Sequence, residues 1–167
     1  GYRAAGHSFW GIIERDFNQY VHLGDGSQVT DNMVYDPNLR LGEVSGERSG
    51  KADDRWAFTN HDTAVEYKAI TALAASSRIL RGYEDDLAKE CLETATKSWE
   101  LEQSSGPVVQ LTKDSHMLEP QEVFAAVELL VTTGEDKYRK RLLELKPRIT
   151  ENFERVGWAV ARALPLI

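Results

Sequence analysis

Several features that mark familiar functional classes are missing from this 167-residue sequence. Its single cysteine, Cys91, excludes an intramolecular disulfide, and no apolar run reaches the about 18 residues that a membrane-spanning helix needs. No cysteine–histidine cluster has the spacing of a zinc site, because the histidines are scattered: His7, His22, His61 and His116. There is also no G-x-S-x-G nucleophile motif and no glycine loop placed to hold a phosphate.

The sequence also contains fewer basic than acidic residues. Lys and Arg number 20 against 27 Asp and Glu, which gives a net charge of -7. An acidic chain is repelled by phosphate backbones, so we expect no nucleic-acid partner, and we expect no membrane partner either. No signal peptide is visible, and the chain starts at Gly1 without an initiating Met and ends in an apolar tail. We therefore expect both ends to be cut from a longer protein.

The most informative feature present is an internal repeat at an offset of 51 residues. Four short matches carry it: Ala74-Ala75 with Ala125-Ala126, Ile79-Leu80 with Leu130-Val131, Glu84-Asp85 with Glu135-Asp136, and Leu92-Glu93 with Leu143-Glu144. Each copy predicts an apolar helix, a turn at a glycine and a more charged helix. A pair of this kind must stack on neighbours to bury its apolar face, which favours an all-α array of hairpins, open or closed into a toroid. Two unrelated hairpins that are alike by chance are the alternative.

Apolar spacing predicts where the helices lie. Residues 62–102 and 119–146 should form two antiparallel pairs, with the first helix of each pair more buried. Thr63 and Glu66 fit a capping box, with Asn60 and Asp62 as further N-cap candidates. Phe9, Ile13, Phe17 and Tyr20 predict an earlier helix over residues 5–21. Residues 22–57 have no periodicity and predict a long Gly/Asp-rich loop, and a loop of that length is usually functional or disordered.

The segment 54–60, Asp-Arg-Trp-Ala-Phe-Thr-Asn, leads into the helix that ends Ser77-Arg78-Ile79-Leu80. Together with residues 122–130 and 133–138 of the second copy, it resembles the middle of glycoside hydrolase family 9, the inverting endoglucanase family. The resemblance implies a fold that is part of an (α/α)6 toroid, with residues 1–167 forming one partial domain. It also implies hydrolysis of β-1,4-linked glucans, a glucan or oligosaccharide partner, no required cofactor, and a secreted or periplasmic location.

The sequence departs from that family where the chemistry should be. The family's catalytic base lies in an Asp-Ala-Gly-Asp type of motif, and its general acid is a Glu near the end of the domain; neither is recognisable here. Inverting hydrolysis needs two carboxyl groups roughly 6.5–9.5 Å apart. We therefore assign no catalytic residue to this chain. The alternative function is a helical-repeat protein-interaction module without enzymatic activity. Another toroid enzyme, such as a lyase or uronyl hydrolase, is less favoured. Such enzymes prefer basic clefts for their acidic sugars, whereas this chain is acidic.

Five residues are candidates for substrate binding. The resemblance suggests a cleft position for His22, for Glu122 at the start of an inner helix, and for Arg55 and Trp56 just ahead of another, with Tyr35 as a further stacking residue. An indole can cover the apolar face of a sugar. The alternatives are ordinary: His22 as a helix cap, Trp56 as a packing residue, and Glu122 as a carboxylate favoured by the helix dipole.

Two further expectations concern a metal and a partner. Asp25, Asp31 and Asp36 lie among glycines and hydroxyl residues in the predicted loop and are candidate ligands for a structural calcium ion, with ordinary Asp-Gly turns as the alternative. If neighbouring hairpins are absent, apolar surface should be uncovered on the inner helices and favour self-association. The residues concerned are Ile70, Leu73, Phe124 and Val127.

Overall fold

The computed structural model describes residues 6–8, 12–14, 31, 33–51, 55–57, 61–108 and 118–167. The chain divides into two units, one formed by Gly1–Ser8 with Asn60–Ile167 and the other by Phe9–Thr59. The first unit is helical, whereas the second contains short strands. No helix in the described part of the chain combines the length and apolarity that crossing a bilayer requires.

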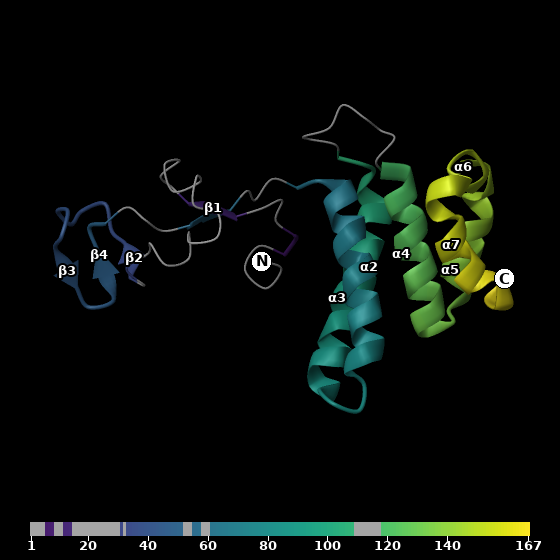
Figure 1. The fold of residues 1–167 in the computed structure, drawn as a ribbon, viewed down its shortest axis with the longest axis horizontal. Helices are drawn as coiled ribbons and strands as arrows, with labels where there is room; N and C mark the ends of the chain where they lie inside the picture. The colour runs from purple at the N-terminus through teal and green to yellow at the C-terminus, as the bar shows by residue number, and fades with distance from the viewer. Residues whose placement is uncertain are drawn as a thin grey trace. The chain divides into compact units, whose positions relative to one another are not determined.

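The helical unit consists of successive hairpins (Figure 1). Helix α2 (Thr63–Leu80) is followed by the antiparallel α3 (Asp85–Ser105), and α4 (Leu118–Thr133) by α5 (Asp136–Glu144). Shorter helices α6 (Lys146–Glu151) and α7 (Phe153–Ala163) and the 3-10 turn η4 (Leu164–Leu166) complete it. Helix α2 packs against both α3 and α4, and α4 packs against α7. The predicted all-α stack of hairpins is therefore confirmed.

The two hairpins bury their helices as the repeat predicts. In α2, 3 of the 18 residues are exposed, against 11 of the 21 residues in α3. Helix α4 has no exposed residue among those whose burial is described, whereas six of the nine residues of α5 are exposed. Both turns depend on a glycine in the left-handed region, Gly82 at φ 83° and Gly134 at φ 69°. Side chains with a Cβ rarely adopt this conformation, which explains why each copy has a glycine in its turn.

Local hydrogen bonds start α2, but not as the capping box predicts. The Asp62 carboxylate accepts from the backbone N–H groups of Ala64 at 3.0 Å and Val65 at 3.1 Å, so Asp62 is the N-cap residue. The Glu66 side chain does not return to the cap, because it accepts a hydrogen bond from the backbone of Ser8 instead. The capping box of Thr63 and Glu66 is therefore wrong.

The core of the helical unit lies between the inner helices and extends to α7. Ile70 and Val127 are fully buried at its centre, while Leu73 and Phe124 are partly buried against it. The uncovered patch that we expected around these four residues is therefore wrong, because α2 and α4 cover each other and α7 covers α4. Exposed apolar side chains of the helical unit lie elsewhere and include Ile79, Tyr83, Phe153, Trp158 and Leu164. Self-association stays a prediction, but this patch no longer supports it.

The unit Phe9–Thr59 contains two small sheets. Strand β1 (Ile12–Glu14) pairs antiparallel with β5 (Arg55–Ala57), so that Ile13 lies opposite Trp56. Strand β4 (Arg48–Ser49) lies between a parallel β2 (Val34–Tyr35) and an antiparallel β3 (Val44–Ser45). The helix predicted over residues 5–21 is therefore wrong at Ile12–Glu14. The β-branched pair within it suits a strand, and β5 supplies the ladder.

Candidate functional site

A polar pocket of about 300 Å³ opens in the helical unit at the end where α2 and α4 begin and α3 ends. Five helices, α2 to α6, contribute its polar side chains, and Tyr67, Pro107 and Leu118 give it apolar surface. The lining residues are Thr63, Tyr67, Glu102, Gln103, Gly106, Pro107, Leu118, Glu122, Arg141 and Arg148. This volume is at the lower end of the range typical of small-molecule sites.

Glu122, a predicted substrate-binding residue, lies in this pocket and is 4% exposed. Its Oε1 atom accepts hydrogen bonds from Arg141 Nε at 2.8 Å, Arg141 Nη2 at 2.7 Å and Gln103 Nε2 at 3.1 Å. Its Oε2 atom faces Arg148 Nη1 at 3.5 Å. The carboxylate is thus oriented by groups from α3, α5 and α6. The alternative, a carboxylate that interacts only with the dipole of its own helix, does not account for these contacts.

Tyr67 forms one wall of the pocket. Its hydroxyl oxygen accepts a hydrogen bond from Gln103 Nε2 at 2.8 Å, and its ring packs on Trp99 with ring centroids 5.7 Å apart. Burial raises the pKa of the Tyr67 hydroxyl, and the nearby carboxylates of Glu122 and Glu102 raise it further. The phenol therefore stays protonated, so its O–H group remains a hydrogen-bond donor at any physiological pH.

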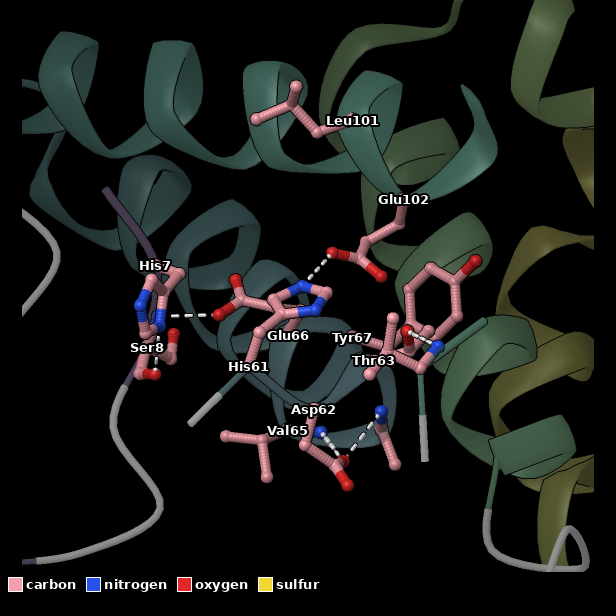
Figure 2. Close-up of polar contacts among 12 residues, drawn as sticks. His7, Ser8, His61, Asp62, Thr63, Val65, Glu66, Tyr67, Leu101 and Glu102 are labelled. Carbon is pink, nitrogen blue, oxygen red and sulfur yellow. Dashed lines mark hydrogen bonds and ion pairs between the residues drawn. The ribbon is translucent and has the colours of Figure 1, made fainter. Parts of the chain in front are cut away.

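A second group of titratable side chains adjoins the pocket through Glu102 (Figure 2). Glu102 Oε1 lies 2.6 Å from His61 Nε2, whereas Oε2 is buried and has no hydrogen-bond partner among the described residues. Glu66 is 2% exposed, and its Oε1 atom accepts the backbone N–H of Ser8 at 2.5 Å. The His7 ring meets the His61 ring edge-on at a centroid distance of 6.0 Å.

Burial raises the pKa of the Glu66 carboxyl. The hydrogen bond from Ser8 opposes this shift, and the negative charge of Glu102 adds to it. Despite the four titratable side chains, no group of three or more His, Cys, Asp or Glu within the described residues is arranged to hold a metal ion.

The other predicted site residues lie in the unit Phe9–Thr59. Tyr35 is on β2, and Arg55 and Trp56 are on β5, in a strand pair instead of the predicted loop. His22 lies outside the described residues. The structure brings none of these together with Glu122 within one unit, and their role in substrate binding stays a prediction.

The calcium candidates are only partly described. Asp31 Oδ1 accepts the Met33 N–H at 2.9 Å, and its other oxygen accepts the Ser49 hydroxyl. Asp36 Oδ1 accepts the Asn38 N–H at 2.9 Å, and Asp36 Oδ2 lies 3.4 Å from Arg48. Hydrogen bonds of this kind lower the pKa of both carboxyls. Asp25 lies outside the described residues, so the calcium hypothesis stays a prediction.

Sequence reasoning missed most of the pocket. Tyr67, Gln103, Glu102, Arg141 and Arg148 come from four different helices, and no spacing along the chain relates them. Their common position is visible only in the fold, where the start of α2 and the end of α3 meet at the pocket.

Comparison with known proteins identifies the class. The family model described as glycosyl hydrolase family 9 matches residues 13–165, and the chain belongs to this family. Its hairpins accordingly form part of the family's (α/α)6 toroid, as the sequence predicts. The family name places the chain among the glycosidases, a class of hydrolases.

Among solved structures, the chain is similar to one described as the crystal structure of a metagenome-derived glycoside hydrolase family 9 endoglucanase. The two are 23% identical, with a TM-score of 0.48, over 60% of this chain and 19% of that one. This chain thus spans about a fifth of the length of that enzyme. No curated protein matches the sequence.

Proposed function

We propose that this chain is a segment of a glycoside hydrolase that cleaves β-1,4-linked glucans by inversion. The observation that carries the proposal is the family match over residues 13–165. The resemblance of residues 54–60 and of the second repeat copy to the inverting endoglucanases supports the same substrate class. Because polymeric glucan does not cross membranes, the substrate implies an enzyme that is secreted or periplasmic.

The catalytic carboxylates lie outside these residues in this proposal. Inversion needs one carboxyl group to protonate the leaving oxygen and another to activate water, roughly 6.5–9.5 Å away. The buried carboxylates in and beside the pocket are already engaged: Glu122 with Arg141, Glu102 with His61, and Glu66 with the Ser8 amide. The contribution of this chain is then to contact glucan, through Arg55, Trp56 and Glu122 and through His22 and Tyr35.

Two measurements on the purified 167-residue chain test the proposal. The first is reducing-sugar release from carboxymethylcellulose, which should be undetectable. The second is calorimetric binding of cellotetraose, which should be weak and lost in Trp56→Ala. Trp158→Ala is the matched control, because Trp158 is an exposed indole on α7 and should leave binding unchanged.

Two outcomes would contradict the proposal. Robust turnover that Asp31→Asn abolishes would place the catalytic carboxylates within residues 22–57. Absence of cellotetraose binding by the wild-type chain would remove the glucan contact and favour the interaction-module alternative. A longer form of the protein that contains this segment should hydrolyse the same substrate.

A further inference from the structure

We propose that the pocket lined by Tyr67, Gln103, Glu102 and Glu122 binds a single pyranose unit through its hydroxyl groups. The inference rests on the proposed function for the substrate class. It adds a site in the helical unit that involves none of the sugar contacts predicted in the unit Phe9–Thr59. The first reason for the proposal is that hydrogen bonds within the protein do not use all the polar atoms of the lining residues.

Glu102 supplies the first of these atoms. Its side chain is 4% exposed, and its Oε2 atom is buried without a hydrogen-bond partner among the described residues. Leaving a carboxylate oxygen unsatisfied costs on the order of 1–3 kcal/mol, so a donor is expected there. Figure 2 shows the Glu102 carboxylate between the rings of His61 and Tyr67, and it is the His61 side that already has a partner. Because Glu102 lines the pocket, this buried oxygen is the acceptor that we assign to a ligand bound there.

Glu122 and Tyr67 supply complementary groups. Glu122 Oε2 faces Arg148 at 3.5 Å, longer than a good N–H···O hydrogen bond, and a carboxylate oxygen can accept more than one donor. The Tyr67 oxygen already accepts from Gln103, which leaves its O–H group to donate. The pocket thus presents two acceptors and one donor, all oriented by contacts with neighbouring helices. Hydroxyl groups, which both donate and accept, match this set.

The charge balance selects a neutral ligand. Two carboxylates, Glu102 and Glu122, line the pocket with two guanidinium groups, Arg141 and Arg148. A phosphate or sulfate would meet the carboxylates, and an ammonium ion would meet the arginines, so each would be repelled by half of the lining. The Tyr67 ring, Pro107 and Leu118 add apolar surface. A ligand with many hydroxyls, no charge and an apolar C–H face is a pyranose.

The experiment is a titration of the isotope-labelled 167-residue chain with D-glucose, followed by NMR. The side-chain amide of Gln103 and the Nε–H of Arg141 report on the pocket, because both donate to Glu122. We expect saturable shifts of these signals with a Kd on the order of 1 mM. Tyr67→Phe removes one hydrogen bond, worth about 1 kcal/mol, and should raise the Kd about fivefold. The matched control is Tyr83→Phe, since Tyr83 is 87% exposed and lies at the far end of the hairpin.

The outcomes separate this inference from the proposed function. Saturable shifts that weaken in Tyr67→Phe and persist in Tyr83→Phe and Trp56→Ala support the pocket. Absence of shifts, an equal Kd in Tyr67→Phe, or an equal response to glycerol or sulfate would overturn it. If cellotetraose still binds and Trp56→Ala abolishes that binding, the proposed function stands while the pocket assignment fails. If neither sugar binds in any assay, both fail together.

Discussion

Arg141 on α5 donates two hydrogen bonds to a single oxygen of Glu122 on α4, from Nε at 2.8 Å and from Nη2 at 2.7 Å. The same guanidinium also contacts Glu144 on its own helix, through Nη1 at 2.8 Å. Arg141 therefore fixes both the outer helix and the carboxylate that lines the polar pocket. Because Glu122 is buried, this pair is a structural element of the hairpin as well as part of the candidate site.

The first prediction concerns the stability of this pair. Arg141→Met leaves the buried Glu122 carboxylate with only part of its hydrogen bonds, which should cost about 1–3 kcal/mol of unfolding free energy. The control is Arg139→Met on the same helix, where the partner Asp136 is itself exposed, and it should cost less than about 0.5 kcal/mol. Urea unfolding measures both values. Equal losses of unfolding free energy in the two variants would mean that the burial of Glu122 does not strengthen its pairing with Arg141.

A second prediction concerns Glu128, which joins three helices. The α4 carboxylate is bound by Arg78 of α2 and Arg162 of α7. Burial by itself raises the pKa of the Glu128 carboxyl, but the hydrogen bonds from Arg162 and Arg78 outweigh it and lower the pKa below its usual value. The folded state therefore favours the charged form. The resulting stability is present above the unfolded pKa and is lost as the pH falls through the folded one.

Glu128→Gln should therefore destabilise the chain at neutral pH, by about 1–3 kcal/mol. The difference from wild type should shrink as the pH is lowered through the carboxylate range, since wild-type Glu128 is then neutral too. Glu100→Gln is the control, because Glu100 is an exposed partner of Lys137. Thermal unfolding across pH measures the effect. A difference that grows in acid would contradict the assigned direction.

The hairpins could be predicted from the sequence because their signals are local and repeated. Apolar spacing in α2 and α4 and the turn glycines Gly82 and Gly134 are readable without a fold. The strand at Ile12–Glu14 could not be predicted in this way, because its stability depends on β5, a segment distant in the sequence. Ile13 fits a helical spacing as well as a strand, and the pairing partner decides between them.

The candidate site was predictable only at one residue. Glu122 stood out at the start of an inner helix, but its partners Gln103 and Arg141 come from two other helices, and no motif connects them. Glu66 illustrates the same limit. Its position suggests a capping box, yet tertiary contact with the Ser8 backbone determines its hydrogen bond. Local rules anticipate the helices, whereas the polar contacts depend on which helix ends meet.

A third prediction uses the glycine of the second hairpin. Gly134 has a φ of 69°, so Gly134→Ala should cost about 1 kcal/mol or more. Gly157→Ala in α7 is the contrasting variant. A Cβ there would lie 3.0 Å from the ring of Phe153, but that ring is 65% exposed and can shift. The gain in helix propensity, about 0.5–1 kcal/mol, should then make Gly157→Ala neutral or stabilising in urea unfolding. Unchanged stability in Gly134→Ala would contradict the turn assignment.

The last prediction concerns Glu66, whose carboxyl faces Ser8, His7, His61 and Glu102. Burial raises its pKa in the folded chain, so the folded state retains the proton at a pH where the unfolded chain has lost it. Wild-type stability should accordingly fall as the pH rises from the unfolded value, about 4.3, through the folded one, and stay reduced above it.

Glu66→Gln removes that ionisation while its amide oxygen can still accept the Ser8 N–H. The variant should therefore have a higher Tm than wild type at about pH 8, and the advantage should disappear toward about pH 4, where Glu66 is protonated in both states. Glu93→Gln, at an exposed position of α3, should show no such dependence. Calorimetry across this range decides the matter. A variant less stable than wild type at the alkaline end would show that the charged Glu66, held by Ser8 and the two histidines, stabilises the fold in spite of its burial.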